Sequence, residues 1–308
     1  MANLARTSGL PARILLATDL STGSERALER AVWLATSWQA RLTILHVFRE
    51  SPDPASLTAQ AHALPSWQRP PDAVSIAKQR IRQGLHTDVG AAVEKASVLV
   101  EEGEPAEVIE RVAIAEGSEL VVTGIAHESP FANQPVILGK TLERLLRRSP
   151  APILIVRNRV RASYEHILVA TDFSDVSRHA LQAALRFFPL RRLRLLHAFE
   201  APYTGLVSEP AAYNRSYGEA RARDLEGFLD SIFLSSDLRS RIDPLIEYGR
   251  AAQLISQYVR DHSADLVVLG THGRGAVLES LIGSTAKNIL ATLTCDALVV
   301  RGPRAGTR

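Results

Sequence analysis

The chain has 308 residues, of which 46% are hydrophobic, so we expect about two domains with ordinary buried cores. Lys and Arg number 36 and Asp and Glu 33, and the net charge of +3 is too small for the clustered basic field that nucleic-acid binding needs. The single cysteine, Cys295, excludes an intrachain disulfide and a cysteine metal site. Because residues 1–13 lack a signal-peptide core and no apolar run is long enough to cross a membrane, we expect a soluble, cytoplasmic protein.

In chain order, the first half alternates short apolar runs with amphipathic stretches. The runs are nearly continuous in Ile, Val and Leu, as expected for strands buried on both faces, and they cover residues 14–18, 42–48, 96–100, 119–124 and 152–156. Apolar residues at helical spacing predict helices over 24–38, after a candidate N-cap at Ser21, and over 105–117. This alternation predicts an α/β fold with a parallel sheet and right-handed crossovers. Residues 51–90 and their counterpart 201–237 are less regular, and we expect a loop followed by a helix in each.

The second half of the chain repeats the first in the same order. Asp19 recurs as Asp172, 153 positions later, and Gly139 recurs as Gly283, 144 positions later. Self-similarity over the whole length indicates a tandem duplication of one fold. The expected domains are residues 1–158 and residues 163–308.

A glycine pattern follows an apolar run of the second copy. Gly270 ends that run, Gly273 lies three positions on, and Gly283 precedes a stretch with helical spacing. Ligands of open parallel sheets bind beyond the carboxyl ends of the strands, where glycines permit close backbone approach and a helix start offers N–H groups to an anion. We call the candidate members the phosphate cradle: Gly270, Gly273, Arg274, Gly283, Ser284 and Thr285. Glycines also serve ordinary turns and helix caps, which is the alternative interpretation.

The order Gly, two residues, Gly, nine residues, Gly, Ser is similar to the ATP-binding signature of the universal stress protein family. The segments VATDFS (169–174) and LLHAF (195–199) resemble that family too, and the similarity covers nearly the whole chain once per copy. The resemblance implies two Rossmann-like domains of the adenine nucleotide alpha hydrolase type, each a parallel sheet in the order 3-2-1-4-5. It also implies ATP at the carboxyl edge of the sheet, with Mg²⁺ bridging its phosphates.

The same resemblance assigns parts of the nucleotide to residues of the second copy. Asp172 would contact the ribose or adenine side, and backbone groups of Ala170, Thr171 and Ala198 would line the adenine slot. The phosphate cradle would hold the phosphates. An acidic residue after a strand can instead cap the next helix, here together with Ser174, so both roles stay open for Asp172.

We expect no catalytic residue. His46 and His197 each lie near the end of the second apolar run of a copy, but a histidine in such a run is more often a buried residue with a satisfied hydrogen bond. No serine or cysteine nucleophile pattern accompanies either one. The sequence therefore predicts slow ATP hydrolysis at most.

The first copy has lost the glycine pattern. His127 replaces the second glycine, eleven residues instead of nine separate it from Gly139, and Lys140 replaces the serine. The GKT triplet suggests a Walker A loop, but Gln134 stands where that loop needs a glycine. We expect the second copy to bind ATP and the first to serve mainly as a structural partner, although Lys140 could still supply a charge to a phosphate.

The resemblance further implies that the two copies pair through their last strands, 152–157 and 297–301. Such pairing would cover two apolar edges that otherwise invite aggregation, and a homodimer of chains is also compatible with the sequence. Three functions stay open: an ATP-binding regulatory or stress-response protein, a nucleotide-dependent hydrolase or transferase of related fold, and a nucleotide-independent interaction scaffold. The complete glycine pattern favours the first.

Overall fold

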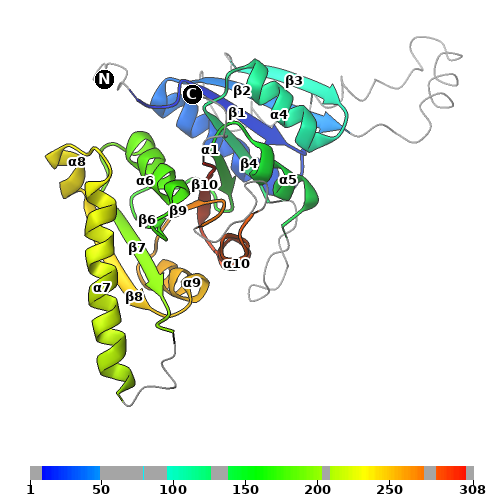
Figure 1. The fold of residues 1–308 in the computed structure, drawn as a ribbon. Coiled ribbons are helices and arrows are strands. Elements are labelled where there is room, and N and C mark those ends of the chain that lie inside the picture. The colour runs from blue at the N-terminus through cyan, green and yellow to red at the C-terminus, as the bar shows by residue number, and fades with distance from the viewer. Residues whose placement is uncertain are drawn as a thin grey trace, which may run out of the picture.

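The fold is taken from a computed structural model, which describes residues 9–48, 79, 96–125, 138–202, 209–273 and 282–302. Ten strands of this described chain form one sheet between two layers of helices (Figure 1). The first half contributes β1 (Arg13–Thr18), β2 (Arg41–Phe48), β3 (Ser97–Glu102), β4 (Leu120–Gly124) and β5 (Ile153–Val156). The second half contributes β6 (Ile167–Ala170), β7 (Leu193–Phe199), β8 (Ile242–Tyr248), β9 (Leu266–Gly270) and β10 (Asp296–Val300).

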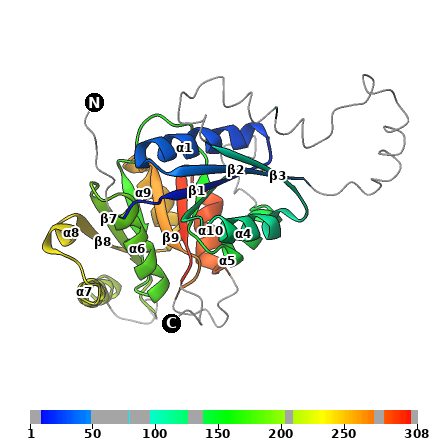
Figure 2. The same ribbon diagram turned by 90° about the horizontal axis from the view of Figure 1, so that it is seen from above.

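Helices connect the strands within each half, and Figure 2 shows them on both sides of the sheet. In the first half the helices α1 (Thr22–Trp38), α4 (Pro105–Ala115) and α5 (Lys140–Arg148) lie within the described residues. The second half contains α6 (Asp175–Phe187), α7 (Pro210–Asp230), α8 (Ser236–Ser240), α9 (Ala251–Asp261) and α10 (Ser284–Thr292).

The strand order is the same in both halves. Across the sheet, the first half runs β3-β2-β1-β4-β5, and the second half continues as β10-β9-β6-β7-β8. Read from its outer edge, the second half is β8-β7-β6-β9-β10, which is the same order. All neighbours within a half are parallel. Each half therefore has the order 3-2-1-4-5, and the prediction of an α/β fold with this order is confirmed.

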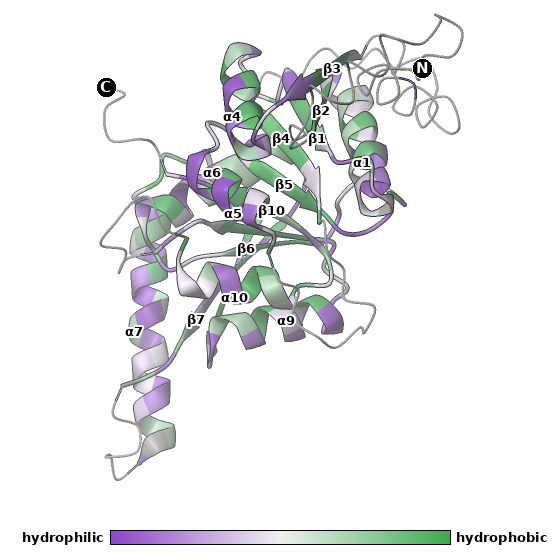
Figure 3. Cartoon of the chain, turned by 90° about the vertical axis from the view of Figure 1, so that its right-hand side faces the viewer, coloured by the Kyte–Doolittle hydropathy of each residue, from purple (hydrophilic) through white to green (hydrophobic). Residues whose placement is uncertain are grey.

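Both faces of the sheet are buried, which explains the nearly continuous apolar runs. Along β1, Ile14 and Leu16 belong to the core on one face, whereas Leu15 and Ala17 belong to the core on the other. Helices α1, α6 and α7 pack on the face that carries Ile14 and Leu16. Helices α4, α5, α9 and α10 pack on the face that carries Leu15 and Ala17. The hydropathy of the strands beneath these helices is visible in Figure 3.

The local predictions have three different outcomes. Ser21 does occupy the N-cap position of α1, but its side chain makes no capping hydrogen bond, whereas Ser174 of the second half accepts one from the Ser177 N–H. The helix expected within 201–237 is present as α7, and a further short helix, α8, begins at the end of that range. The segment 51–90 lies outside the described residues, apart from residue 79, which is helical.

The two halves join through their last strands. Strands β5 and β10 are antiparallel neighbours, with Leu154 opposite Leu298 and Ile155 opposite Ala297. The side chains of this seam are buried on both faces of the sheet. One continuous sheet therefore runs through both halves, and each half-sheet ends against the other.

A buried carboxylate, Asp296, lies beside this seam. Its Oδ1 accepts hydrogen bonds from the backbone N–H groups of Arg157 and Asn158, at 2.8 and 3.0 Å. Its Oδ2 accepts one from the Tyr164 hydroxyl at 2.5 Å and lies 3.6 Å from Arg30 Nε. The Arg30 guanidinium also lies over the Tyr164 ring, 4.1 Å from its centroid. Asp296 thus ties β10 to the segment between the halves and to α1.

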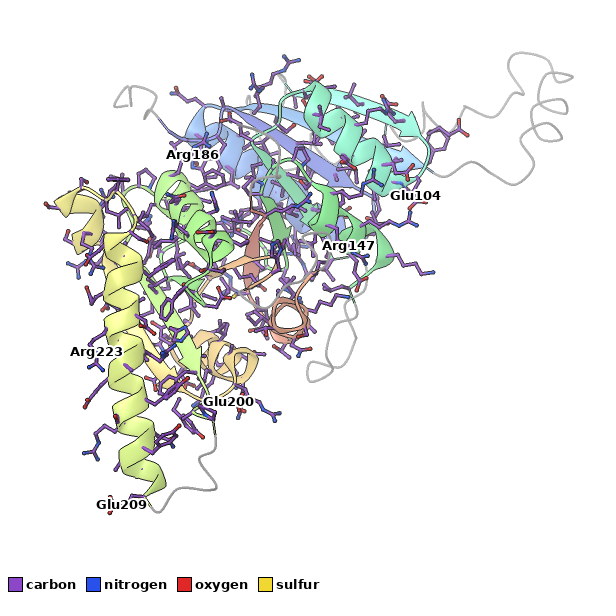
Figure 4. All side chains as sticks on the ribbon, in the orientation of Figure 1. Glu104, Arg147, Arg186, Glu200, Glu209 and Arg223 are labelled. Atoms are coloured by element: carbon purple, nitrogen blue, oxygen red, sulfur yellow. The ribbon has the colours of Figure 1, made fainter. Side chains whose placement is uncertain are left out.

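A second contact joins α6 to the first half on the surface. Arg186, labelled in Figure 4, donates to Glu119 Oε1 at 2.5 Å, and Glu119 Oε2 accepts from the Ala12 N–H at 2.7 Å. Partial burial acts to raise the pKa of Glu119, but the hydrogen bonds from Ala12 and Arg186 outweigh it, so that this pKa lies below its ordinary value.

Candidate nucleotide site

A pocket of about 820 Å³ lies at the carboxyl ends of β6, β7 and β9, where α10 begins. We call it the second-half pocket. Nine predicted site residues line it or lie in its wall: Ala170, Thr171, Asp172, Ala198, Gly270, Gly273, Gly283, Ser284 and Thr285. The tenth, Arg274, lies outside the described residues. The fold thus brings segments that are about a hundred residues apart in sequence to one edge of the sheet.

The turn after β6 is held by His197. The His197 ring is buried, its Nδ1 bonds the Thr171 carbonyl at 2.8 Å, and its ring stacks on Phe173 with centroids 4.0 Å apart. In the first half, His46 Nδ1 bonds the Thr18 carbonyl in the same way, at 2.9 Å. These contacts give both histidines a structural role in fixing the strand-end turn.

Asp172 supports the start of helix α6. Its Oδ1 accepts hydrogen bonds from the Ser174 N–H at 3.1 Å and from the Ser174 hydroxyl at 2.6 Å. Ser174 in turn accepts from the Ser177 N–H at 3.2 Å and so caps the helix. The capping role, which the sequence left open, is therefore present, and the same carboxylate also lines the second-half pocket.

Two of the three signature glycines have close contacts within the protein that a larger residue would disturb. A Cβ on Gly270 would lie 2.8 Å from Val176 Cγ1, and a Cβ on Gly273 would lie 2.1 Å from Asp172 Oδ2. Both distances are far inside van der Waals contact. Packing against α6 therefore accounts for Gly270 without any ligand, and a side chain at position 273 would displace the Asp172 carboxylate from its present place.

Gly283 is different. Among the described residues, a Cβ at this position would approach no heavy atom more closely than 3.5 Å, the distance to His272 Cα. Its backbone angles, φ −59° and ψ 146°, are open to any residue. Neither packing against the described residues nor backbone conformation requires a glycine here, and its small size leaves room for a ligand to approach the backbone closely.

The start of α10 presents polar groups to the pocket. Gly283 donates its N–H to the Thr271 carbonyl at 2.8 Å, which fixes where the helix begins. Ser284 and Thr285 follow as its first two residues and line the pocket. Within the described residues, neither their N–H groups nor their hydroxyls take part in a hydrogen bond. A helix N-terminus with free donors attracts anions.

The pocket has a second rim that the sequence reasoning missed. Glu200 and Arg250 line it beyond the ends of β7 and β8, with Glu200 Oε1 and Arg250 Nε 3.7 Å apart (Figure 4 labels Glu200). Gly249, with φ +139°, turns the chain at this rim, and Gly103 repeats that turn in the first half with φ +142°. This glycine occurs in both copies, and that repeat is the sequence signal from which the rim could have been predicted.

A smaller pocket of about 340 Å³ occupies the corresponding place in the first half. We call it the first-half pocket. Its wall contains Val47, Lys140 and Leu142 where the second half has Ala198, Ser284 and Ala286. His127 and Gln134, on which the loss of the glycine pattern was argued, lie outside the described residues.

The fold and the two pockets define a duplicated α/β protein with a ligand-type pocket at the carboxyl edge of each half-sheet. The profile of the universal stress protein family matches residues 12–157 and, a second time, residues 163–301. The chain belongs to the universal stress protein family and carries its domain in tandem. Among the described residues, no helix combines the length and the apolar character that a membrane span needs.

Two universal stress proteins are similar in sequence to parts of the chain. A universal stress protein of Thermus aquaticus is 33% identical over 144 residues, which is 45% of this chain and 99% of the relative. Universal stress protein E of Escherichia coli K12 is 23% identical over 212 residues, 64% of this chain and 65% of that protein.

Solved structures share the fold over nearly the full length. A universal stress protein of Archaeoglobus fulgidus superimposes with a TM-score of 0.61 at 20% identity, covering 94% of this chain and 98% of that one. A functionally unknown protein of Pseudomonas aeruginosa gives a TM-score of 0.61 at 22% identity, covering 95% and 93%. At this level of identity the two structures support the tandem α/β fold.

Proposed function

We propose that the chain is an ATP-binding regulatory or stress-response protein in which the second half holds the nucleotide. The observation that carries the proposal is the start of α10. There, Ser284 and Thr285 offer donors without a partner among the described residues, next to a glycine, Gly283, that packing against those residues does not require. These features lie at one end of a pocket whose volume falls within the range of small-molecule sites.

The phosphates would bind at the phosphate cradle. Backbone N–H groups of Ser284 and Thr285 would donate to phosphate oxygens, and the positive end of the α10 dipole would favour the anion. Arg274 would add a positive charge. Mg²⁺ would bridge phosphate oxygens and complete its coordination with water, as it commonly does with nucleotides.

The base and ribose would occupy the other end of the pocket. Ala170 and Ala198 lie at the ends of β6 and β7, where their small side chains leave room for a flat ring. Backbone groups of Ala170, Thr171 and Ala198 can give hydrogen bonds to the adenine edge. Asp172 would accept from a ribose hydroxyl while it keeps its bonds to Ser174.

The first half is a poorer place for ATP. Its pocket is about 340 Å³ against about 820 Å³ in the second half. Val47 and Leu142 add bulk where the second half has alanines, and Lys140 removes the hydroxyl that Ser284 supplies. The first half would therefore act mainly as a structural partner.

Little or no hydrolysis is proposed, because the groups that could activate water have other contacts. Asp172 Oδ1 accepts two hydrogen bonds from Ser174. His272 lines the pocket, and its Nδ1 bonds the Thr271 hydroxyl at 3.0 Å. The position of His272 is also the observation that favours the second candidate, a nucleotide-dependent hydrolase, since its Nε2 could serve as a general base.

Calorimetric titration of the whole protein with Mg-ATP tests the proposal. The variant Gly283→Val should lose ATP binding, because the added branches would occupy the place of the phosphates. Gly139→Val is the matched control: it is the equivalent position, a Cβ there meets no atom of the described residues within 4 Å, and ATP binding should be retained. Both variants should unfold at the same urea concentration as the parent.

Analysis of the small molecules released on denaturation, followed by a phosphate-release assay, separates the candidates. Recovered ATP with negligible phosphate release supports the proposal. Rapid turnover that His272→Gln abolishes would establish the hydrolase instead. If neither recovered nucleotide nor added ATP binds, the interaction scaffold is the correct function.

A further inference from the structure

The residues that line the first-half pocket do not suit a nucleotide, but they suit another kind of ligand. It lies beyond the carboxyl ends of β1 and β4, bounded by α4 and α5. Its volume of about 340 Å³ is at the lower end of the range for small-molecule sites. Duplication has therefore kept a pocket in this half while its lining has changed.

Most of the lining is apolar and comes from rigid elements. Val47 lies near the end of β2, Ile109 projects from α4, and Leu142 and Leu145 project from α5. Ile125, just after β4, completes this wall. An apolar pocket with a few well-placed polar groups is the usual form of a site for a small organic molecule.

One cation lies at the edge of this apolar pocket. Lys140 is the first residue of α5 and lines the pocket. Within the described part of the chain it makes no hydrogen bond and no ion pair. By contrast, Arg144 and Arg147 of the same helix pair with Glu104 and Glu143, at 3.1 and 3.2 Å.

Lys140 is exposed and stands in the first turn of α5, where the helix dipole does not favour a positive charge. A lysine in the first turn of a helix adds its positive charge to the positive end of the helix dipole, whereas the last turn would suit it. The carboxylate in the pocket wall, Asp19, accepts a hydrogen bond from the Ser21 N–H at 3.0 Å and forms no ion pair with Lys140. A bound anion would relieve the excess positive potential.

From this arrangement we infer that the first-half pocket binds a small amphipathic anion, an aliphatic group that ends in a carboxylate or a phosphate. The apolar chain lies against Val47, Ile109 and Leu145, and the anionic head lies at Lys140 and the N-terminus of α5. The inference does not depend on ATP binding by the second half, because the two pockets share no residue.

Titration of the whole protein with aliphatic carboxylates of increasing length tests the inference. Affinity should rise about fourfold for each added methylene, because each one buries apolar surface, until the pocket is full and the gain stops. Octyl phosphate is the second arm, and it distinguishes a phosphate head from a carboxylate head. Octanamide should bind at least about tenfold more weakly than octanoate, since its head carries no charge.

Two variants locate the site. Lys140→Met should weaken octanoate binding about tenfold and leave the octanamide affinity unchanged, because it removes the charge and keeps the length. Arg144→Met is the matched control on the same helix, and it should leave octanoate binding unchanged. Val47→Phe should block both ligands by filling the pocket, with thermal unfolding as the check that the fold is intact.

ATP provides the last distinction. Saturating Mg-ATP should not displace octanoate, and Gly283→Val should leave octanoate binding unchanged. Competition by ATP, equal affinity for octanoate and octanamide, an unaffected Lys140→Met variant, or no binding by any member of the series would each overturn the inference. Failure of ATP to bind at all would defeat the proposed function and leave this result standing.

Discussion

Glu143 Oε1 and Lys287 Nζ form an ion pair of 3.1 Å that joins α5 to α10. The two residues are equivalent in the duplication, since each is the fourth residue of its helix. Both helices begin at a pocket. The ion pair therefore connects the two pockets through the first turns of their helices.

Breaking this ion pair should change ATP binding by the second half. Glu143→Gln removes the counter-ion of Lys287 one turn from the phosphate cradle, so ATP affinity should rise about threefold, the scale expected of a partly exposed pair. Titration at low and high salt measures the effect, which should shrink as salt increases. Glu107→Gln, which removes a carboxylate near Arg148, is the control. An unchanged or lower affinity for Glu143→Gln would contradict this account.

The signature glycines should separate into two groups by stability. Gly270→Ala and Gly273→Ala should each cost about 1–3 kcal/mol of unfolding free energy, because the new Cβ collides with Val176 or with Asp172. Gly283→Ala should stay within about 0.5 kcal/mol of the parent, since its Cβ has room. Urea unfolding measures all three. A similar loss at all three positions would contradict the difference in packing between Gly283 and the other two glycines.

The buried Asp296 should be a sensitive point of the whole fold. Asp296→Ala leaves Arg30 buried without its carboxylate and should cost about 3–5 kcal/mol. Tyr164→Phe removes one hydrogen bond to the same carboxylate and should cost about 1–2 kcal/mol. Asp243→Ala, at an exposed pair with Arg194, is the control and should change little. The prediction fails if Asp296→Ala costs no more than this control.

Alkaline pH should destabilise the protein in two steps. Burial raises the pKa of Cys295 from 9.0 to about 12, and burial followed by the charge of Asp296 raises the pKa of Tyr164 well above 10.0. Both groups therefore stay protonated to a higher pH in the folded state than in the unfolded state. Their stabilising contribution is therefore complete below pH 9 and is lost as pH rises, by about 1.4 kcal/mol per pH unit for each group.

Urea unfolding as a function of pH measures this loss. Cys295→Ala should remove the slope that begins near pH 9, because 9.0 is the ordinary value of its thiol. Tyr164→Phe should remove the slope that begins near pH 10. The sign is fixed by linkage, so a protein that becomes more stable between pH 9 and pH 11 would contradict both assignments.

The fold was predictable from the sequence because the patterns that indicate its strands and helices are local and occur in both copies of the repeat. Strands buried on both faces give short, nearly continuous apolar runs, and Ile14 to Ala17 are an example in which alternate side chains fill opposite cores. The repeat of Asp19 as Asp172 then fixed the duplication. The short helix α8, which follows the predicted helix α7, was not predicted, because the stretch that contains them differs between the copies.

The positions of the site residues could be predicted from the sequence, but the contacts that explain why those residues are there could not. A Cβ on Gly273 would collide with the carboxylate of Asp172, a contact between residues about a hundred positions apart, and no local pattern reveals such a contact. The double role of Asp172 has the same origin. The burial of Asp296 was also invisible, because its partners Arg30 and Tyr164 come from other segments.

The antiparallel seam of β5 and β10 limits how further copies can add to the chain. Pairing through the last strand consumes one edge from each half, so the sheet described here ends at β3 and at β8. Both end strands carry polar and exposed positions, including Pro244 in β8, which cannot donate a backbone hydrogen bond. A second copy of the chain therefore cannot extend the sheet through β5 or β10, because both strands already have a neighbour on each side within one chain.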